Sequence, residues 1–218
     1  MNKIIGILFA VILGVWVNSC SDDPEIDYGD FIEVFATYVG EEDGMEKLSY
    51  QAHDDSREIT LRVGNLGLDR LQAGDRIYLR YTVLNRISDD ELEVRSDGAM
   101  KVVNDMLRRA SADTIDMVED TPIRVTSLWR TGNYINLNSW VPYVGSSFQL
   151  ALIADDATLE RDTVEAKLLY YIGSQKPTFE RKCYASINIG NLWRKGSCKS
   201  LRIYVNDPKG KDYYEFNK

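Results

Sequence analysis

Short apolar runs interrupted by polar residues dominate this chain, and they predict β-strands. The clearest is 77–84 (IYLRYTVL), which alternates, is rich in β-forming residues and follows a turn at Gly74. Further strands are expected over 31–39, 48–52, 59–63, 91–95 and 100–103. Helical periodicity is almost absent, and only the polar stretch 104–109 is compatible with a helical turn.

A second set of strands follows an acidic stretch over 110–122 that lacks apolar periodicity and is closed by Pro122. Segments 123–129 and 134–141 flank a Thr-Gly-Asn turn at 131–133 and predict a β-hairpin. Further strands are expected over 147–153, 163–172, 185–189, 201–205 and 213–216. Many short strands with turns between them indicate an all-β chain built as a sandwich or barrel.

The N-terminal segment has the pattern of an export signal. Lys3 is the only charge before Asp22, and 4–17 is almost unbroken apolar sequence. That run is short for a membrane span, which needs about 20 apolar residues. The sequence Val-Asn-Ser-Cys at 17–20 resembles the lipobox of bacterial lipoproteins. The resemblance implies a signal peptide over 1–19 and lipidation of Cys20. A plain signal peptide and an N-terminal anchor helix are the alternatives.

The residues after Cys20 predict a location. Ser21, Asp22 and Asp23, followed by Pro24 and Glu25, resemble the acidic surface-export signal of Bacteroidetes lipoproteins. The resemblance implies an outer membrane lipoprotein that faces the cell surface, with 20–30 as an acidic tether. The alternative is a tether that is acidic merely because tethers are often polar.

Composition limits the possible partners. A hydrophobic content of 44%, with 13 Tyr against 5 Pro, is typical of a folded chain. The net charge is −8, and the chain contains no run of Lys or Arg. Nucleic-acid binders need a basic surface to displace counterions from phosphates, so we expect no nucleic-acid partner.

Cys183 and Cys198 remain once Cys20 carries lipid. An exported chain can hold a disulfide. However, each cysteine begins an expected strand, and an antiparallel hairpin of those strands would place the two at opposite ends. A disulfide would need another topology, and both outcomes stay open.

Several segments in chain order resemble the NigD-like lipoproteins of Bacteroidetes. Besides the lipobox, they are 27–31 (DYGDF), 73–79 (AGDRIYL), 123–129 (IRVTSLW), 132–137 (GNYINL), 186–189 (SINI) and 201–205 (LRIYV). The resemblance covers nearly the whole chain. It implies an N-terminal OB-like barrel, placed at 31–110, and a C-terminal β-sandwich, placed at 120–218. It supplies no catalytic residue, and the family's name implies a role in bacteriocin immunity.

Candidate chemistry is sparse. His53 is the only histidine and lies in a polar turn, which is typical of a solvated loop. The acidic clusters at 41–44 and 88–91 lack the ligand spacing of a calcium loop. We therefore expect no catalytic residue, no metal and no cofactor.

Aromatic residues are the candidate binding surface. Trp129, Tyr134, Trp140 and Tyr143 cluster in the predicted hairpin and could contact sugar rings or a partner protein, although large aromatics more often fill a core. On the implied barrel, the candidate face consists of Tyr38, Tyr78, Arg80 and Thr82.

Taken together, these patterns predict a membrane-anchored, non-enzymatic binding protein with an unknown protein or glycan partner. The family resemblance implies bacteriocin immunity as one form of this binding role. The alternative is a glycan-binding accessory protein of a polysaccharide-uptake system, and a hydrolase is a third class for which no nucleophile and base are found.

Overall fold

Strands make up most of the structure, a computed structural model that describes residues 31–145 and 148–218. The barrel strands are β1 (Ile32–Glu42), β2 (Met45–Gln51), β3 (Glu58–Val63), β4 (Arg76–Arg86) and β5 (Glu91–Lys101). The later strands are β6 (Val103–Met106), β7 (Arg108–Ala110), β8 (Arg124–Thr131), β9 (Tyr134–Tyr143), β10 (Gln149–Asp155), β11 (Thr163–Tyr171), β12 (Phe179–Asn188), β13 (Ser200–Val205) and β14 (Tyr213–Asn217). The helices are α1 (Ala112–Asp116), the 3-10 turn η1 (Asp156–Thr158) and α2 (Gly190–Trp193). In the described ranges, no helix is both long and apolar enough to cross a bilayer.

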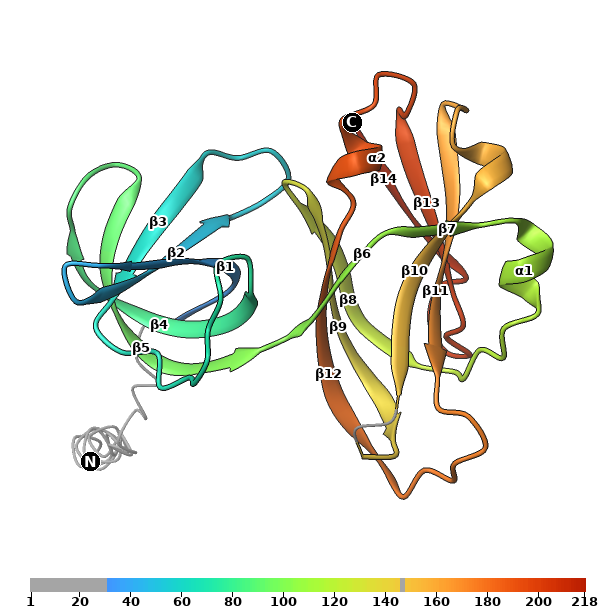
Figure 1. Cartoon of the computed structure of the whole chain (residues 1–218), viewed down its shortest axis with the longest axis horizontal. Coiled ribbons are helices and arrows are strands. Elements are labelled where there is room, and N and C mark those ends of the chain that lie inside the picture. Colours follow the sequence, from blue (N-terminus) through green and yellow to red (C-terminus); the bar gives the residue numbers. More distant parts are fainter. Residues whose placement is uncertain (1–30, 146–147) are drawn as a thin grey trace, which may run out of the picture.

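The first domain is a closed barrel with the strand order β1-β2-β3-β5-β4, in which β4 also pairs with β1 (Figure 1). Strands β3 and β5 are parallel, and the other neighbours are antiparallel. Alternate side chains fill the interior; they include Leu48, Leu61, Leu79 and Tyr81, each fully buried. A small barrel closed in this way has no free sheet edge, and it confirms the predicted OB-like barrel.

The second domain is a sandwich of two sheets, β6-β12-β9-β8 and β14-β13-β11-β10-β7 (Figure 1). Apolar side chains from both sheets interdigitate between them, for example Leu137 and Ile187 with Leu152 and Leu168. The all-β prediction of a barrel followed by a sandwich is therefore confirmed.

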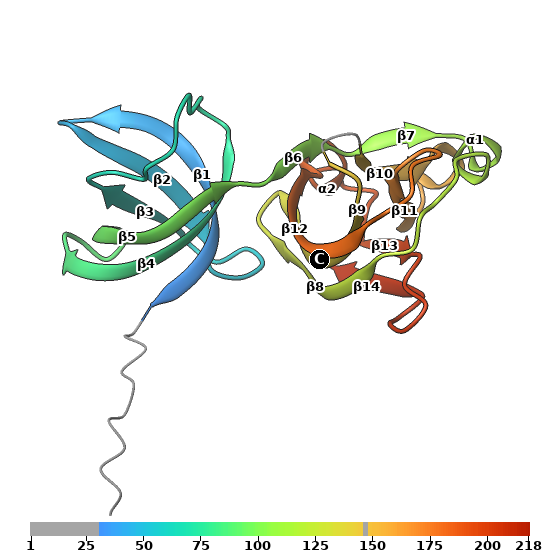
Figure 2. The same ribbon diagram turned by 90° about the horizontal axis from the view of Figure 1, so that it is seen from below.

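The two domains are joined without a linker. Barrel strand β5 ends at Lys101 and β6 begins at Val103, so Val102 is the residue between them (Figure 2). Val102 is buried, and its amide donates to the Arg76 carbonyl at 3.1 Å. Strands β6 and β7 then pair with β12 and β10, one in each sheet of the sandwich. The division thus lies at Val102, whereas the sequence placed residues up to 110 in the barrel.

Two local expectations were wrong. Residues 104–109 form parts of β6 and β7 and contain no helical turn, because they add as parallel edge strands to the two sheets. The strands expected over 91–95 and 100–103 are not separated as predicted, because β5 runs without a break from Glu91 to Lys101 and β6 begins at Val103. The turn-like residues Ser96 and Gly98 pair with β4 across a register shift next to Arg80.

Both described cysteines are free and buried. Cys183 lies on β12, whereas Cys198 precedes β13 in the other sheet, so their strands do not form a hairpin. Burial raises the pKa of the Cys183 thiol to about 11 and also raises the pKa of the Cys198 thiol. The thiolate is the reactive form, and it is therefore scarce at both positions near neutral pH.

Thiol accessibility tests this burial. In a chain that begins at Ser21, the native protein should react slowly with a disulfide-exchange reagent at pH 8. After unfolding in denaturant without reductant, both Cys183 and Cys198 should react rapidly. Fast reaction of the native protein would contradict the burial. Failure of the two cysteines to react after unfolding would indicate a disulfide between them.

Candidate functional site: the cleft between barrel and sandwich

Aromatic side chains hold the barrel against the sandwich. Phe35 on β1 and Tyr78 on β4 are cross-strand partners on the outer face of the barrel. The Phe35 ring meets the Trp129 ring edge-on at a centroid distance of 5.0 Å, and Tyr78 stacks on Tyr184 at 4.5 Å. Such pairs contribute about 0.5–1.5 kcal/mol each beyond the area they bury.

A charged clasp forms a second contact between the domains. The Arg130 guanidinium, at the end of β8, donates to both carboxylate oxygens of Asp55 at 2.9 and 2.8 Å. Its side chain is 2% exposed and lies 4.7 Å from the centre of the Trp193 ring. Asp55 belongs to the β2–β3 loop of the barrel, so this bidentate pair fixes that loop to the sandwich.

The turn between β8 and β9 completes the clasp. Gly132 adopts a φ of +52° and its amide donates to the Asp54 carbonyl at 2.5 Å. A Cβ at this position would collide with Gln51 on β2. Because that contact is with the far end of a flexible side chain, it is the positive φ that makes glycine favourable in this turn.

A polar cleft lies beside these contacts. Its volume is about 290 Å³, and it is lined from both domains by Thr37, Val39, Ser49, Tyr50, Gln51, Glu58, Arg76, Thr131, Asn133 and Tyr134. Clefts between domains that bring several polar groups together are common ligand sites, which makes this one the candidate site.

Arg76 is the dominant charge in the cleft. It is 3% exposed, and its terminal nitrogens donate to Thr37 Oγ1 at 2.8 Å, to the Phe35 carbonyl at 3.3 Å and to Asn136 Oδ1 at 3.1 Å. The guanidinium lies 4.1 Å from the centre of the Tyr134 ring. Burial lowers the pKa of Arg76 to about 10, so the group stays protonated at neutral pH.

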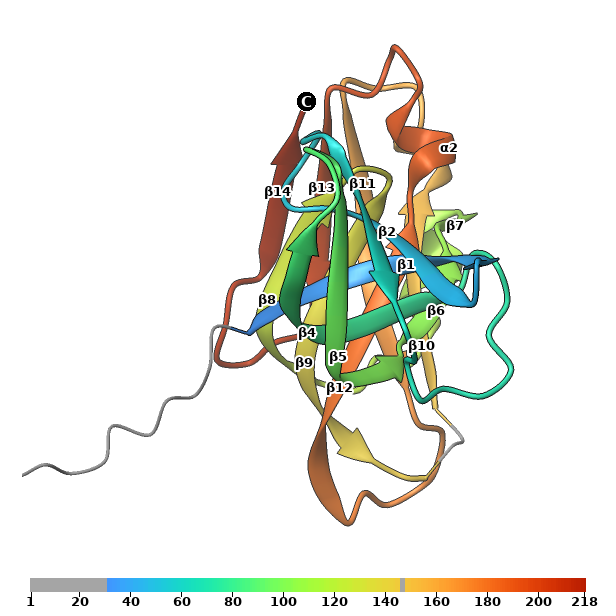
Figure 3. The same ribbon diagram turned by 90° about the vertical axis from the view of Figure 1, so that its left-hand side faces the viewer.

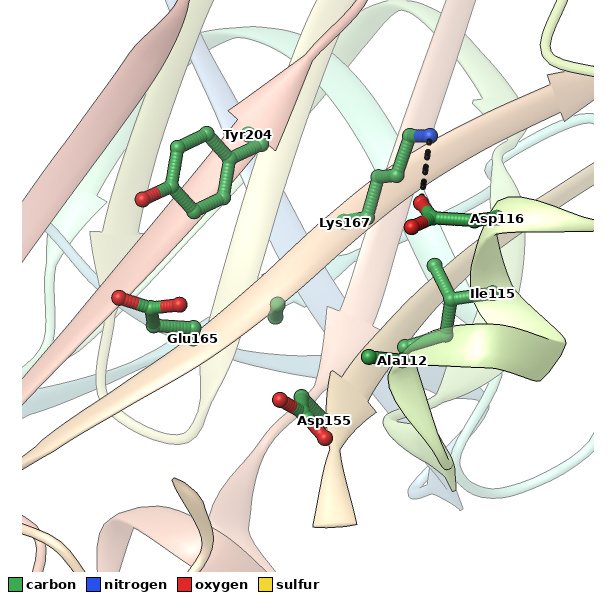
Figure 4. A pocket seen from close by; sticks show the side chains of 8 residues that line it. Ala112, Ile115, Asp116, Asp155, Glu165, Lys167 and Tyr204 are labelled. Atoms are coloured by element: carbon green, nitrogen blue, oxygen red, sulfur yellow. Dashed lines mark ion pairs between the residues drawn. The ribbon is translucent and has the colours of Figure 1, made fainter. Parts of the chain in front are cut away.

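A second depression lies on the outer face of the β14-β13-β11-β10-β7 sheet next to α1 (Figure 4). Its volume is about 310 Å³, and its lining includes Asp155, Glu165, Lys167 and Tyr204. Lys167 pairs with Asp116 at 3.8 Å, and the Asp155 carboxylate caps η1 through the Ala157 amide. Its charged groups are thus exposed or already engaged, in contrast to buried Arg76.

The structure separates the four predicted aromatic residues into two places. Trp129 and Tyr134 contact barrel residues in the interface, whereas Trp140 and Tyr143 lie further along β9. Figure 3 shows the ends of β9 and β12 extending beyond the barrel. There Trp140 lies 5.1 Å from the Arg124 guanidinium, and Tyr143 packs against Phe179 at 4.8 Å. Their role in binding stays a prediction.

The predicted barrel face is largely occupied. Tyr78 packs against the sandwich, and the Arg80 guanidinium covers the Phe31 ring at 3.7 Å. Thr82 donates to Asp97 at 2.6 Å. Tyr38 is half-buried next to the β1–β2 register shift.

Two other sets of sequence predictions fall elsewhere. His53 is exposed in the loop that carries Asp54 and Asp55. Cys20 and the export residues Ser21, Asp22 and Asp23 lie outside the described residues, as does the predicted signal peptide. Within residues 31–145 and 148–218, no group of three or more His, Cys, Asp or Glu side chains is arranged to hold a metal ion.

Sequence reasoning missed Arg76, Arg130 and Asn136. Arg76 looked like the end of a turn, and Asn136 alternates with the apolar residues of β9 as a solvent-facing position would. Both are buried because the other domain covers them. The one available signal was the run of polar residues on the outer side of β9, which a solvated strand shows equally well.

No protein-family model matches the sequence, and no curated protein matches it in sequence. Solved structures do match in fold. A protein of unknown function (DUF1344) from Bacteroides vulgatus ATCC 8482 has a TM-score of 0.71 and 15% identity, covering 86% of this chain and 90% of that one.

An immunity protein is among the other matches. A NigD-like immunity protein from Bacteroides caccae ATCC 43185 has a TM-score of 0.58 and 17% identity, covering 88% of this chain and 94% of that one. The chain has the fold of a NigD-like immunity protein. A candidate lipoprotein from Bacteroides fragilis NCTC 9343 also has a TM-score of 0.58, at 11% identity, covering 86% of this chain and 96% of that one. The resemblance seen in the sequence is thus confirmed at the level of the fold.

Loss of the Asp55 carboxylate should weaken the clasp in a pH-dependent way. The hydrogen bond from Arg130 holds the pKa of Asp55 below its ordinary value of 3.8. A lowered folded-state pKa stabilises the protein above the unfolded pKa, and this stability is lost as the pH falls through the folded value. Asp55→Asn should therefore lower the free energy of unfolding by about 1 kcal/mol at pH 7, since exposure of Asp55 weakens the pair. The difference from wild type should shrink by pH 3.

Urea unfolding of wild type and Asp55→Asn at pH 7 and pH 3 measures this difference in the free energy of unfolding. The matched control is Asp90→Asn, which removes an exposed pair with Arg57 at 3.9 Å and should change little. An equal loss for both variants at pH 7, or an undiminished Asp55→Asn effect at pH 3, would contradict the clasp.

Proposed function

We propose that this chain is a lipid-anchored protein of the bacterial envelope with a non-enzymatic, immunity-type binding role. The observation that carries the proposal is the fold, which matches that of a NigD-like immunity protein over 88% of this chain. The fold alone does not fix a function, so the anchor and the character of the site must support it.

The anchor comes from Cys20 and its lipobox. Each buried methylene contributes about 0.8 kcal/mol to membrane binding, and two or more acyl chains make anchoring stable. The described chain begins at Phe31 on the barrel, 11 residues after Cys20. An extended segment of that length spans at most about 40 Å, so a lipid at Cys20 would keep the barrel close to the membrane.

The side chains support binding more than catalysis. His53 lies in an exposed loop, and burial raises the pKa of both described thiols. In the cleft, the pKa of Arg76 is lowered by burial, yet the guanidinium stays charged at neutral pH. A group that stays charged is better suited to recognition than to proton transfer. We infer that the chain acts by binding a partner protein, such as a secreted toxin of a related strain.

Removal of the gene tests the immunity role. A deletion strain should become sensitive to bacteriocins of sibling strains, and wild-type chain should restore resistance. Cys20→Ala, which removes the acylated sulfur, should fail to restore it although the chain is still made. Full resistance of the deletion strain across the sibling panel would contradict the proposal.

The acidic residues after Cys20 test the surface location separately. The double change Asp22→Asn and Asp23→Asn leaves the lipobox intact, so the chain should still carry lipid by mass spectrometry. Protease added to intact cells should degrade wild type but spare the variant. Equal degradation of both would show that these carboxylates do not direct export.

A further inference from the structure

Among the residues that the structure describes, buried Arg76 has no carboxylate partner. Arg130, in the same interface, has a comparable burial but donates to both oxygens of Asp55. The hydrogen bonds of Arg76 go to a hydroxyl, a carbonyl and an amide, all neutral. In the described part of the chain, its Nε has no hydrogen-bond partner. The charge of Arg130 is therefore balanced by a carboxylate, whereas the hydrogen-bond acceptors of Arg76 are neutral.

An uncompensated buried charge is costly, and buried charges in proteins are usually paired. An anionic ligand would supply the opposite charge that Arg76 lacks. A guanidinium offers five N–H donors in a planar fork that matches a carboxylate. Arg76 uses part of this fork to position itself, and its Nε is enclosed by protein atoms. Among the described residues, Nη1 donates to Thr37 alone, which leaves its second N–H for a further acceptor.

The cleft has the size and lining of a site for one small polar molecule. Its volume of about 290 Å³ lies just below the range of about 300–1,000 Å³ typical of drug-sized ligand pockets. Ser49, Gln51, Thr131 and Asn133 contribute hydroxyl and amide groups from both domains. Such groups can bind the hydroxyl or amine substituents of a ligand.

Glu58 restricts the charge of that ligand. It lines the cleft as an exposed carboxylate and accepts a hydrogen bond from the Ser49 hydroxyl. A dianion would be attracted by the Arg76 guanidinium but repelled by the Glu58 carboxylate. A ligand with one carboxylate and a donor group elsewhere satisfies both residues.

We propose that the cleft between barrel and sandwich binds a small monocarboxylate that carries hydrogen-bond donors, with its carboxylate on Arg76. An amino acid and a sugar acid both have this chemistry. The site is independent of lipidation and immunity, so the titration below and the deletion experiment can fail separately.

The direct reporter is the Arg76 Nε–H signal in a ¹⁵N-correlated NMR spectrum of the folded chain. The amino-acid arm adds L-serine, with L-serinamide as the control that lacks a carboxylate. The sugar-acid arm adds D-glucuronate, with D-glucose as its control. Inorganic phosphate supplies the dianion.

A saturable shift of this signal in one arm, absent with its control, supports the proposal and identifies the source. Shifts in both arms, absent with both controls, support the shared chemistry. The proposal would be overturned if neither L-serine nor D-glucuronate shifts the signal, or if a neutral control shifts it equally. Phosphate binding as tight as that of either carboxylate would also overturn the proposal.

Variants locate the site. Arg76→Lys keeps the charge but loses the fork, and it should weaken binding by about tenfold. Arg57→Lys, at an exposed position outside the cleft, is the matched control and should bind as wild type does. Equal affinity of Arg76→Lys and wild type would contradict the assignment. If Arg76→Lys does not fold, the wild-type titration still decides.

Discussion

The packing of the barrel's β1–β4 face against the outer face of the β6-β12-β9-β8 sheet is the constraint on which the rest of the molecule depends. Each domain has its own apolar core, and Phe35 is buried between them without belonging to either core of the described residues. The buried charges make this contact specific. Arg130 donates to Asp55 and Arg76 donates to Asn136 across the interface. A displacement of the domains would leave these buried donors without hydrogen-bond acceptors. The buried Val102 junction adds a covalent restriction, because it leaves no linker to absorb a rotation.

This packing decides which surfaces remain for function. OB barrels commonly bind ligands on an outer face. Here Phe35 and Tyr78 cover part of that face with the sandwich. Among the surfaces that stay open are the polar cleft next to Arg76 and the end of β9 that extends beyond the barrel (Figure 3).

The sequence was informative wherever burial is decided within one domain. The alternation over 77–84 predicted β4, and the Thr-Gly-Asn turn predicted the β8–β9 hairpin, because a strand's own apolar face fixes its register. It was misleading where a segment depends on distant partners. Strands β6 and β7 have little alternation and exist because β12 and β10 offer free edges.

The candidate site could not be predicted for a related reason. Asn136 and Ser186 occupy outward positions of β9 and β12 that would face water in an isolated sandwich, yet both are fully buried under the barrel. Single-strand periodicity describes one sheet at a time and carries no information about a second domain. The aromatic residues were recognised from composition, but their division between the interface and the free end of β9 required the domain arrangement.

Residual dipolar couplings of the weakly aligned, ¹⁵N-labelled protein test the central claim, that barrel and sandwich form one rigid unit, most directly. Amides in 32–101 and in 103–217 should fit a single alignment tensor with the orientation of the structure. Two tensors of different magnitude or orientation would show that the domains move independently, and would contradict an interface fixed by Phe35, Arg76 and Arg130.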